Sequence, residues 1–162
     1  METFSGAANL LDKRVKTAWR LQSLLSLSPL VLGALVFLGF ANYIDVPLAV
    51  PLLVLLGVLG ALLAAETVVP EVRYRRWRWE VREEEIRLQE GLIVVSQTVI
   101  PMVRVQHVDT AQGPIMRSLG LTDVHIWTAA NKHTIPALAD DHAAQLRDRI
   151  ALLARVTDDG GL

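Results

Sequence analysis

The residues of this chain best suited to chemistry lie in one short stretch, residues 103–109, with the sequence VRVQHVD. Alternation along an extended strand places His107 and Asp109 on the same face as Val105. An imidazole beside a carboxylate is typical of a metal-ligand pair or an acid–base pair. The other histidines are His125, His133 and His142. They complete no known ligand spacing with this pair, so we favour a hydrogen-bonded network that closes a sheet over metal binding or acid–base chemistry.

The rest of the sequence offers little for catalysis. Ser96 and Ser118 lie in no nucleophile motif, and the chain contains no glycine-rich phosphate loop. Cysteine is absent, which removes thiolate chemistry, disulfides and cysteine metal sites. The net charge of −1 gives no bulk attraction to nucleic acid. We predict a protein that is not an enzyme, needs no cofactor and binds no nucleic acid.

A second set of candidate residues is basic and aromatic, and it flanks the apolar part of the chain. After that part come Arg73, Arg75, Arg76 and Arg78, and before it come Lys13, Lys16, Trp19 and Arg20. Clustered basic residues beside a membrane attract anionic lipid. The same charges also fix membrane topology, and we favour topology as their main role while lipid binding stays open.

Two apolar runs predict a transmembrane hairpin over residues 21–66. No charged residue occurs between Arg20 and Asp45, or between Asp45 and Glu66. Each run is long enough for the roughly 20 residues that span a bilayer core. The short turn between the runs carries no lysine or arginine, so we expect two spans with both termini cytoplasmic.

Two local features modify this hairpin. Pro29 lies inside the first run, and the neighbouring Ser26 and Ser28 can satisfy the backbone groups that it frees. In residues 1–20, Leu11, Val15 and Trp19 recur every four residues. This spacing predicts a short amphipathic helix on the inner leaflet, whose last turn continues into the first membrane helix.

From residue 72 the pattern changes to the period of two that is typical of strands. Strands are expected at residues 76–82, 86–89, 92–100, 103–107, 121–128 and 133–135, with one helical turn at 114–119. Trp77, Trp79 and Val81 share one face of the first strand. Asp140 or Asp141 then begins a helix with an apolar stripe. The 162 residues leave room for one such domain, residues 70–157, beside the anchor, with a frayed tail from 157 and disorder over 158–162.

The motifs of this module resemble those of the YdbS-like bacterial pleckstrin-homology (PH) membrane proteins. They are WRWEV, the acidic turn and hairpin REEEIRLQEGL, TVIPMVRVQHVD, QGPIMRSLGL and the short HTIPAL strand. The resemblance implies an α+β membrane protein: a two-helix hairpin, then an antiparallel split β-barrel with a C-terminal capping helix. Some family members are paired with a larger membrane protein that carries repeats of the same domain. The first hairpin loop is acidic here, which disfavours phosphoinositide binding of the eukaryotic kind.

These observations predict a membrane-anchored interaction or scaffolding module in a homo- or hetero-oligomeric assembly. Its partner is a second copy or a PH-domain paralogue. The expected partner surface consists of Arg104, Gln106, His107, Asp109 and Arg117. The alternative is a module that binds anionic lipid or senses envelope stress through the juxtamembrane arginines.

Overall fold

The computed structural model describes residues 9–159 and divides the chain into two compact units. The helical unit consists of residues 19–71. The β-rich unit combines residues before and after it, up to residue 18 and from residue 72 onward. The helical unit is therefore an insertion in the sequence of the β-rich unit.

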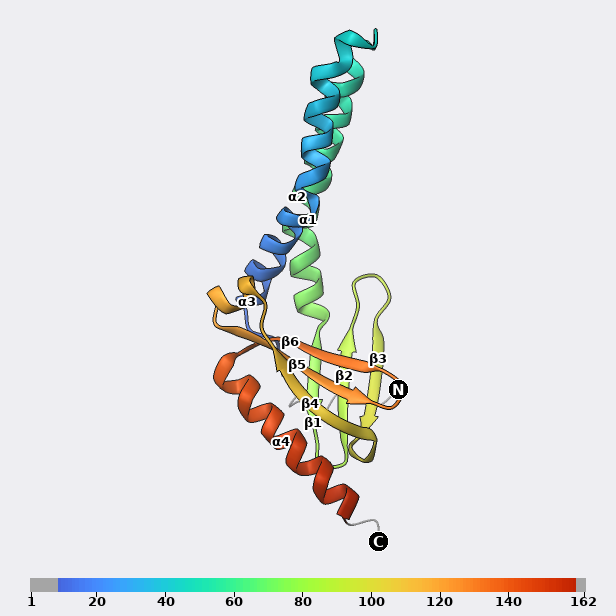
Figure 1. Cartoon of the computed structure of the whole chain (residues 1–162). Coiled ribbons are helices and arrows are strands. Elements are labelled where there is room, and N and C mark those ends of the chain that lie inside the picture. Colours follow the sequence, from blue (N-terminus) through green and yellow to red (C-terminus); the bar gives the residue numbers. More distant parts are fainter. Residues whose placement is uncertain (1–8, 160–162) are drawn as a thin grey trace. The chain divides into compact units, whose positions relative to one another are not determined.

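The elements follow one another in the order helical hairpin, strands, terminal helix (Figure 1). The helices are α1 (Val15–Phe40), α2 (Ala49–Arg76), α3 (Pro114–Ser118) and α4 (Asp140–Asp159), with short 3-10 helices η1 (Ala41–Tyr43) and η2 (Met102–Arg104). The strands are β1 (Arg78–Val81), β2 (Glu85–Glu90), β3 (Ser96–Pro101), β4 (Val105–Ala111), β5 (Leu121–Thr128) and β6 (Lys132–Ala139). The predicted fold class is confirmed.

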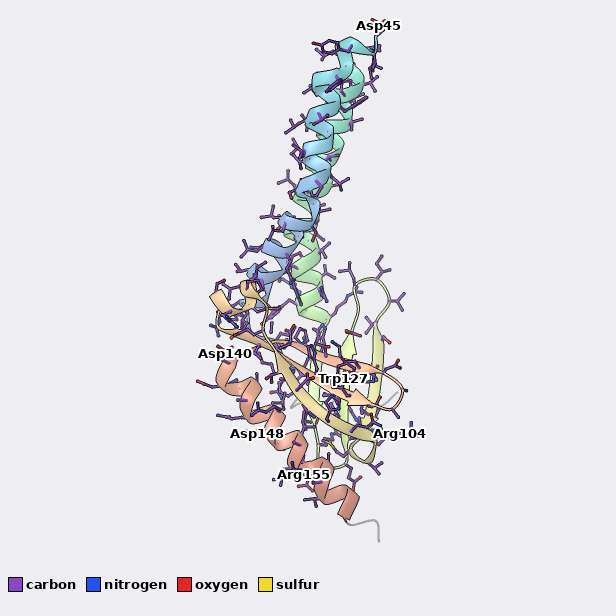
Figure 2. All side chains as sticks on the ribbon, viewed as in Figure 1. Asp45, Arg104, Trp127, Asp140, Asp148 and Arg155 are labelled. Atoms are coloured by element: carbon purple, nitrogen blue, oxygen red, sulfur yellow. The ribbon has the colours of Figure 1, made fainter. Side chains whose placement is uncertain are left out.

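In the helical unit, α1 and α2 lie side by side, with Asp45 at the turn between them (Figure 2). Both helices are long and apolar enough to cross a bilayer. Only 6% of the most apolar window of α1 and 0% of that of α2 is buried. A core helix of a soluble protein would be mostly buried, so these apolar surfaces are open in the way a lipid-facing helix requires.

Two prolines in these helices leave carbonyl oxygens without their usual amide donors, and side chains replace both donors. Proline removes the hydrogen bond to the carbonyl four residues earlier. For Pro29 that carbonyl belongs to Leu25, and the Ser28 hydroxyl donates to it at 2.8 Å, as the sequence predicted. For Pro70 it belongs to Glu66, and Arg20 Nε donates to it at 2.9 Å. The second bond crosses from α1 to α2 and ties the pair together.

The β-rich unit is a split barrel of two antiparallel sheets, in the orders β1-β2-β3 and β4-β5-β6. The first sheet pairs Trp79 with Leu88 and Val81 with Ile86, so the apolar face predicted for β1 is correct. The helix α4 packs on the second sheet and on η2. The core is formed by fully buried side chains from both sheets, η2 and α4: Trp77, Ile86, Met102, Leu121, Val124, Ile126, Ile135 and Ile150.

The segment before α1 belongs to this core and is not a surface helix. Residues Asn9 and Trp79 exchange backbone hydrogen bonds of 2.8 and 3.2 Å. Leu11 is only 3% exposed and Val15 is 0% exposed. The four-residue spacing predicts one helix face, but tertiary packing fixes residues 9–14 as a bridge and a turn, and the helix begins at Val15. The rest of that prediction, residues 1–8, lies outside the described residues.

Several strand limits also differ from the predicted ones. The first strand begins at Arg78, because α2 continues through Arg76. The third begins at Ser96, which pairs with Glu90, so residues 91–95 form a loop. The reason is Gly91, whose φ of 135° turns the chain out of the strand.

The later elements show smaller differences. The fourth strand is displaced to Val105–Ala111, because residues 102–104 form η2. The sixth strand runs on to Ala139, well past the predicted limit at 135. The helix α4 continues through residues 157–159, where a frayed tail was expected, and residues 160–162 lie outside the described residues.

We predict that Leu11→Ala destabilises the β-rich unit by about 2–5 kcal/mol, the usual result of removing a buried leucine side chain. Amide hydrogen exchange of β5 in the detergent-purified full chain measures this change. The matched control is Leu10→Ala, because Leu10 is 49% exposed, and its effect should stay within about 0.5 kcal/mol. Equal effects of the two substitutions would contradict the packing of Leu11.

A double-mutant cycle tests the bond between Arg20 and the Glu66 carbonyl. Arg20→Met keeps the aliphatic stem and should weaken the helix pair by about 1 kcal/mol. Pro70→Ala returns an amide donor to the same carbonyl, so Arg20→Met should cost less in that background. Reversible unfolding of the full chain in mixed micelles measures all four proteins. An equal cost in both backgrounds would show that Arg20 stabilises the pair in another way.

Candidate functional site

The predicted partner stretch, residues 103–109, begins in η2 and continues into β4, an outer strand of the second sheet. Among the described residues, no strand pairs with the outer edge of β4. Pairing with β5 is irregular between Val105 and His107, which places a β-bulge at Gln106. Val103 is 64% exposed, and Arg104, Gln106 and His107 are exposed as well. The strand edge is therefore accessible where the predicted residues lie.

A groove of about 590 Å³ lies between β4 and the second half of α4, which also pack against each other. The strand contributes residues 105–108, η2 contributes Val103, and the helix contributes Ala151, Ala154 and Arg155. Arg155 is labelled toward the end of α4 in Figure 2. The two alanines keep the helix side of the groove shallow, so main-chain atoms of a bound segment can approach β4.

A second hollow of about 460 Å³ lies between β3, β4 and the β5–β6 turn. Val103, Arg104 and Gln106 line it together with residues 98–101 and 128–130. Val103 and Gln106 thus line both hollows. These two residues are therefore accessible from the groove beside α4 and from the hollow beside β3.

His107 and Asp109 lie on one face, as predicted, and Trp127 joins them. The rings of His107 and Trp127 stack with centroids 5.4 Å apart and an interplanar angle of 15°. The Trp127 indole Nε1 donates a hydrogen bond of 3.0 Å to Asp109 Oδ2. Lys132 Nζ lies 5.4 Å from the centroid of the same indole ring. These contacts make a cluster around Trp127, which Figure 2 labels, and the predicted hydrogen-bonded network stays a prediction.

The structure provides no support for the metal alternative in the part of the chain that it describes. No group of three or more His, Cys, Asp or Glu side chains is arranged to hold a metal ion there. His125 instead contacts the Thr134 hydroxyl at 3.0 Å through Nδ1. That histidine lies opposite Asp109 in the β4–β5 register. Its contact with Thr134 joins β5 to β6.

Arg117 does not join the other predicted partner residues. It is exposed on α3, beyond the end of β4, whereas Arg104 immediately precedes the start of that strand. The strand has 7 residues, and a rise of about 3.3 Å per residue separates its first and last residues by roughly 20 Å. The five predicted residues therefore divide into one surface around Arg104, Gln106, His107 and Asp109, and a separate Arg117.

The basic residues after the helical hairpin occupy the last turn of α2 and the start of β1. Arg73 and Arg75 are exposed. Arg76 Nη1 donates to the carbonyl oxygens of Leu92 and Ile93 at 2.5 and 3.3 Å. Arg78 Nη1 donates to the Trp77 carbonyl at 2.7 Å. Arg76 and Arg78 thus brace the backbone while keeping their positive charge.

The basic residues before the hairpin have different surroundings. Lys13 is exposed in the turn before α1, and Lys16 Nζ lies 4.5 Å from the Tyr74 ring centroid. Trp19 is only 8% exposed, so its ring offers little surface to lipid. Arg20 is engaged with the Glu66 carbonyl. The predicted lipid-facing set is therefore divided between the helical unit and the β-rich unit.

Sequence reasoning missed the ion pair between Asp12 and Arg14 in the N-terminal segment. The same arginine also bonds the residue that follows α3. The Asp12 carboxylate accepts hydrogen bonds from the Arg14 amide at 2.9 Å and from Arg14 Nε and Nη2 at 3.1 and 2.9 Å. Arg14 Nη1 donates to the Leu119 carbonyl at 2.7 Å. The pKa of Asp12 lies below its ordinary value, chiefly because the Arg14 side chain donates to it, while partial burial opposes the shift.

Comparison with known proteins identifies relatives for most of the chain. The model of the Bacterial PH domain family matches residues 27–154. Transmembrane protein YdbS of Bacillus subtilis (strain 168) is 42% identical over 146 residues, which are 87% of this chain and 89% of that protein. Transmembrane protein YdbT of the same strain is 27% identical over 95 residues, 59% of this chain and 19% of YdbT. No solved structure matches the chain significantly.

The lowered pKa of Asp12 predicts a pH dependence of stability. A carboxyl whose pKa falls on folding stabilises the fold above its unfolded pKa, about 3.9, and this contribution disappears as the pH falls through the lower folded value. The free energy of unfolding of the wild type should exceed that of Asp12→Asn by less than about 1 kcal/mol at neutral pH. The difference is small because Arg14 is exposed and Asp12 is only partly buried. Unfolding of the full chain measured from pH 7 downward should show that gap closing below about pH 4. A gap that widens there would contradict this assignment.

Proposed function

Since the chain belongs to the Bacterial PH domain family and is a YdbS-like membrane protein, we propose that it is a membrane-anchored interaction module that docks a second PH-like domain. In this proposal it spans the bacterial plasma membrane twice, and the β-rich unit is cytoplasmic. Its role is assembly with a partner, and it carries out no catalysis. The family is not a known enzyme class.

The observation that carries the proposal is the accessible edge of β4 beside the groove to α4. Unpaired strand edges readily bind another chain, and proteins normally cover or disrupt them. Here the bulge at Gln106 interrupts the edge without covering it. An extended segment laid along β4 would gain main-chain hydrogen bonds from the strand and side-chain contacts from α4.

The residues around the edge suit a protein partner. Val103 supplies exposed apolar surface, Gln106 and His107 supply hydrogen-bonding groups, and Arg155 supplies a positive charge on the opposite wall. An apolar centre with a polar rim is typical of protein interfaces. We expect the partner to be another PH-like domain, either a second copy or a paralogue, and the match to part of YdbT supports the existence of such paralogues.

The proposed topology follows from the distribution of lysine and arginine. Four basic residues precede the first apolar run, and four follow the second: Lys13, Arg14, Lys16 and Arg20, then Arg73, Arg75, Arg76 and Arg78. The turn between the helices, around Asp45, contains none. Positive residues remain on the cytoplasmic side, so both termini and the β4 edge face the cytoplasm in this proposal.

Site-specific cross-linking tests the docking surface. Because the chain contains no cysteine of its own, a thiol reagent labels it only at the introduced one. A thiol-reactive photo-cross-linker is attached to Gln106→Cys in the full chain, in native membranes. We expect one dominant adduct, identified by mass spectrometry as a second copy or a PH-domain paralogue. Adding Val103→Asp should strongly reduce the adduct, because it places a charge in the centre of the interface.

The matched control is Ala144→Cys, an exposed position on α4 that does not line the groove. It should give little adduct under the same conditions. Equal yields from the two positions would reveal random collisions in the membrane. A yield at Gln106→Cys that is unaffected by Val103→Asp would move the interface away from β4.

A further inference from the structure

The hairpin loop between β2 and β3 carries four consecutive apolar residues on its surface. Leu92, Ile93, Val94 and Val95 are 38%, 88%, 79% and 44% exposed. Figure 1 shows this loop, residues 92–95, projecting beyond the ends of the two strands. Exposed apolar runs of this length are avoided in water-facing loops unless they serve a function. The sequence pattern predicts a strand over these residues, and the structure has a surface loop instead.

The loop has a defined shape. Gly91, at φ 135°, permits a tight turn in which a Cβ would lie 1.9 Å from the Val94 carbonyl oxygen. Arg76 Nη1 donates to the carbonyl oxygens of Leu92 and Ile93. Those carbonyls are therefore satisfied within the protein while the side chains point outward. Backbone that enters an apolar layer needs its polar groups satisfied in this way.

The hollow at the base of the loop carries one positive and one negative side chain. Arg73 lines this hollow of about 260 Å³ together with Trp77, Glu90, Gly91, Leu92 and Ser96. The last turn of α2, which contains Arg73, also contains Arg75 and Arg76. Basic residues at this location attract the anionic lipids of the cytoplasmic leaflet. An apolar tip with a basic base matches the chemistry of a lipid surface: apolar acyl chains below anionic headgroups.

The sequence between the second apolar run and the loop is short. Glu66 is the first charged residue after that run, and Arg76, which holds the loop, follows it by ten positions on α2. The β-rich unit therefore begins close in sequence to the part of α2 that is apolar enough to cross a bilayer. A lipid surface is thus an available occupant for an apolar loop.

We propose that the apolar loop, residues 92–95, inserts into the interfacial layer of the bilayer, and that anionic lipid headgroups bind beside it at the arginines of α2. The apolar side chains supply the insertion, and Arg73, Arg75 and Arg76 supply the preference for negative charge. The loop and the β4 groove have no lining residue in common. This inference therefore stands whether or not a partner docks at β4.

The test uses the full chain reconstituted into vesicles. A polarity-sensitive fluorophore is attached to Ile93→Cys, and the vesicles contain phosphatidylcholine alone or mixed with phosphatidylglycerol. We expect a blue shift of the emission and its quenching by lipids that carry a spin label near the headgroup, both larger with phosphatidylglycerol. Val94→Cys should give the same result, because it is the other highly exposed position.

The matched control is Val156→Cys, an apolar residue that is 61% exposed on α4 and outside the loop. Quenching at Val156→Cys equal to that at Ile93→Cys would overturn the assignment to the loop. A blue shift without quenching by spin-labelled lipid would show that protein covers the loop, and would also overturn the proposal. Arg73→Gln with Arg75→Gln should remove the phosphatidylglycerol preference, and retention of the preference would overturn the role of the arginines.

Discussion

The β-rich unit depends on contacts between residues that precede the helical hairpin and residues that follow it. The backbone bridge between Asn9 and Trp79 is a contact of this kind. The bond from Arg14 to the Leu119 carbonyl adds another. A flexible insertion between such partners would oppose folding through its closure entropy. Two antiparallel helices bring the ends of the insertion back together, so formation of the hairpin favours closure of the domain.

A second constraint is that carbonyl oxygens must find donors wherever regular backbone pairing ends. Proline creates two such places in the helices, and the Ser28 hydroxyl and Arg20 Nε fill them. Arg76 does the same for the loop after Gly91. An unsatisfied carbonyl is costly in an apolar medium. Arg20 and Arg76 are also positive charges, which the sequence presents as topology signals or lipid contacts. Each residue therefore supplies both a hydrogen-bond donor and a charge.

Much of this architecture was predictable because it follows from local patterns. The apolar runs, the position of β5, the turn at Pro114 and the apolar stripe of α4 are all visible in the order of residue types. The errors arose where distant residues decide the conformation. Leu11 has a helical spacing but is fixed by the sheet, and the apolar residues after Gly91 have strand propensity but lie in a loop.

The candidate sites show the same division. Strand alternation was sufficient to place His107 and Asp109 together, yet their common neighbour is Trp127, about 20 residues away in sequence, and no local pattern connects it to them. The groove beside β4 requires α4 to pack across the second sheet, which a stripe of apolar residues predicts only in outline. Arg104 and Arg117 lie in two neighbouring family motifs, but β4 separates them in the structure.

The placement of the two proposed surfaces determines how they can work together. The apolar loop belongs to the first sheet, and the groove belongs to the second sheet and α4. The two surfaces share no lining residue, so occupation of one does not block the other. Lipid contact at residues 92–95 would therefore leave the β4 edge accessible, while restricting the orientations that the β-rich unit samples. A restricted unit loses less freedom when a partner docks, so membrane contact would strengthen docking without any change in the docking surface itself.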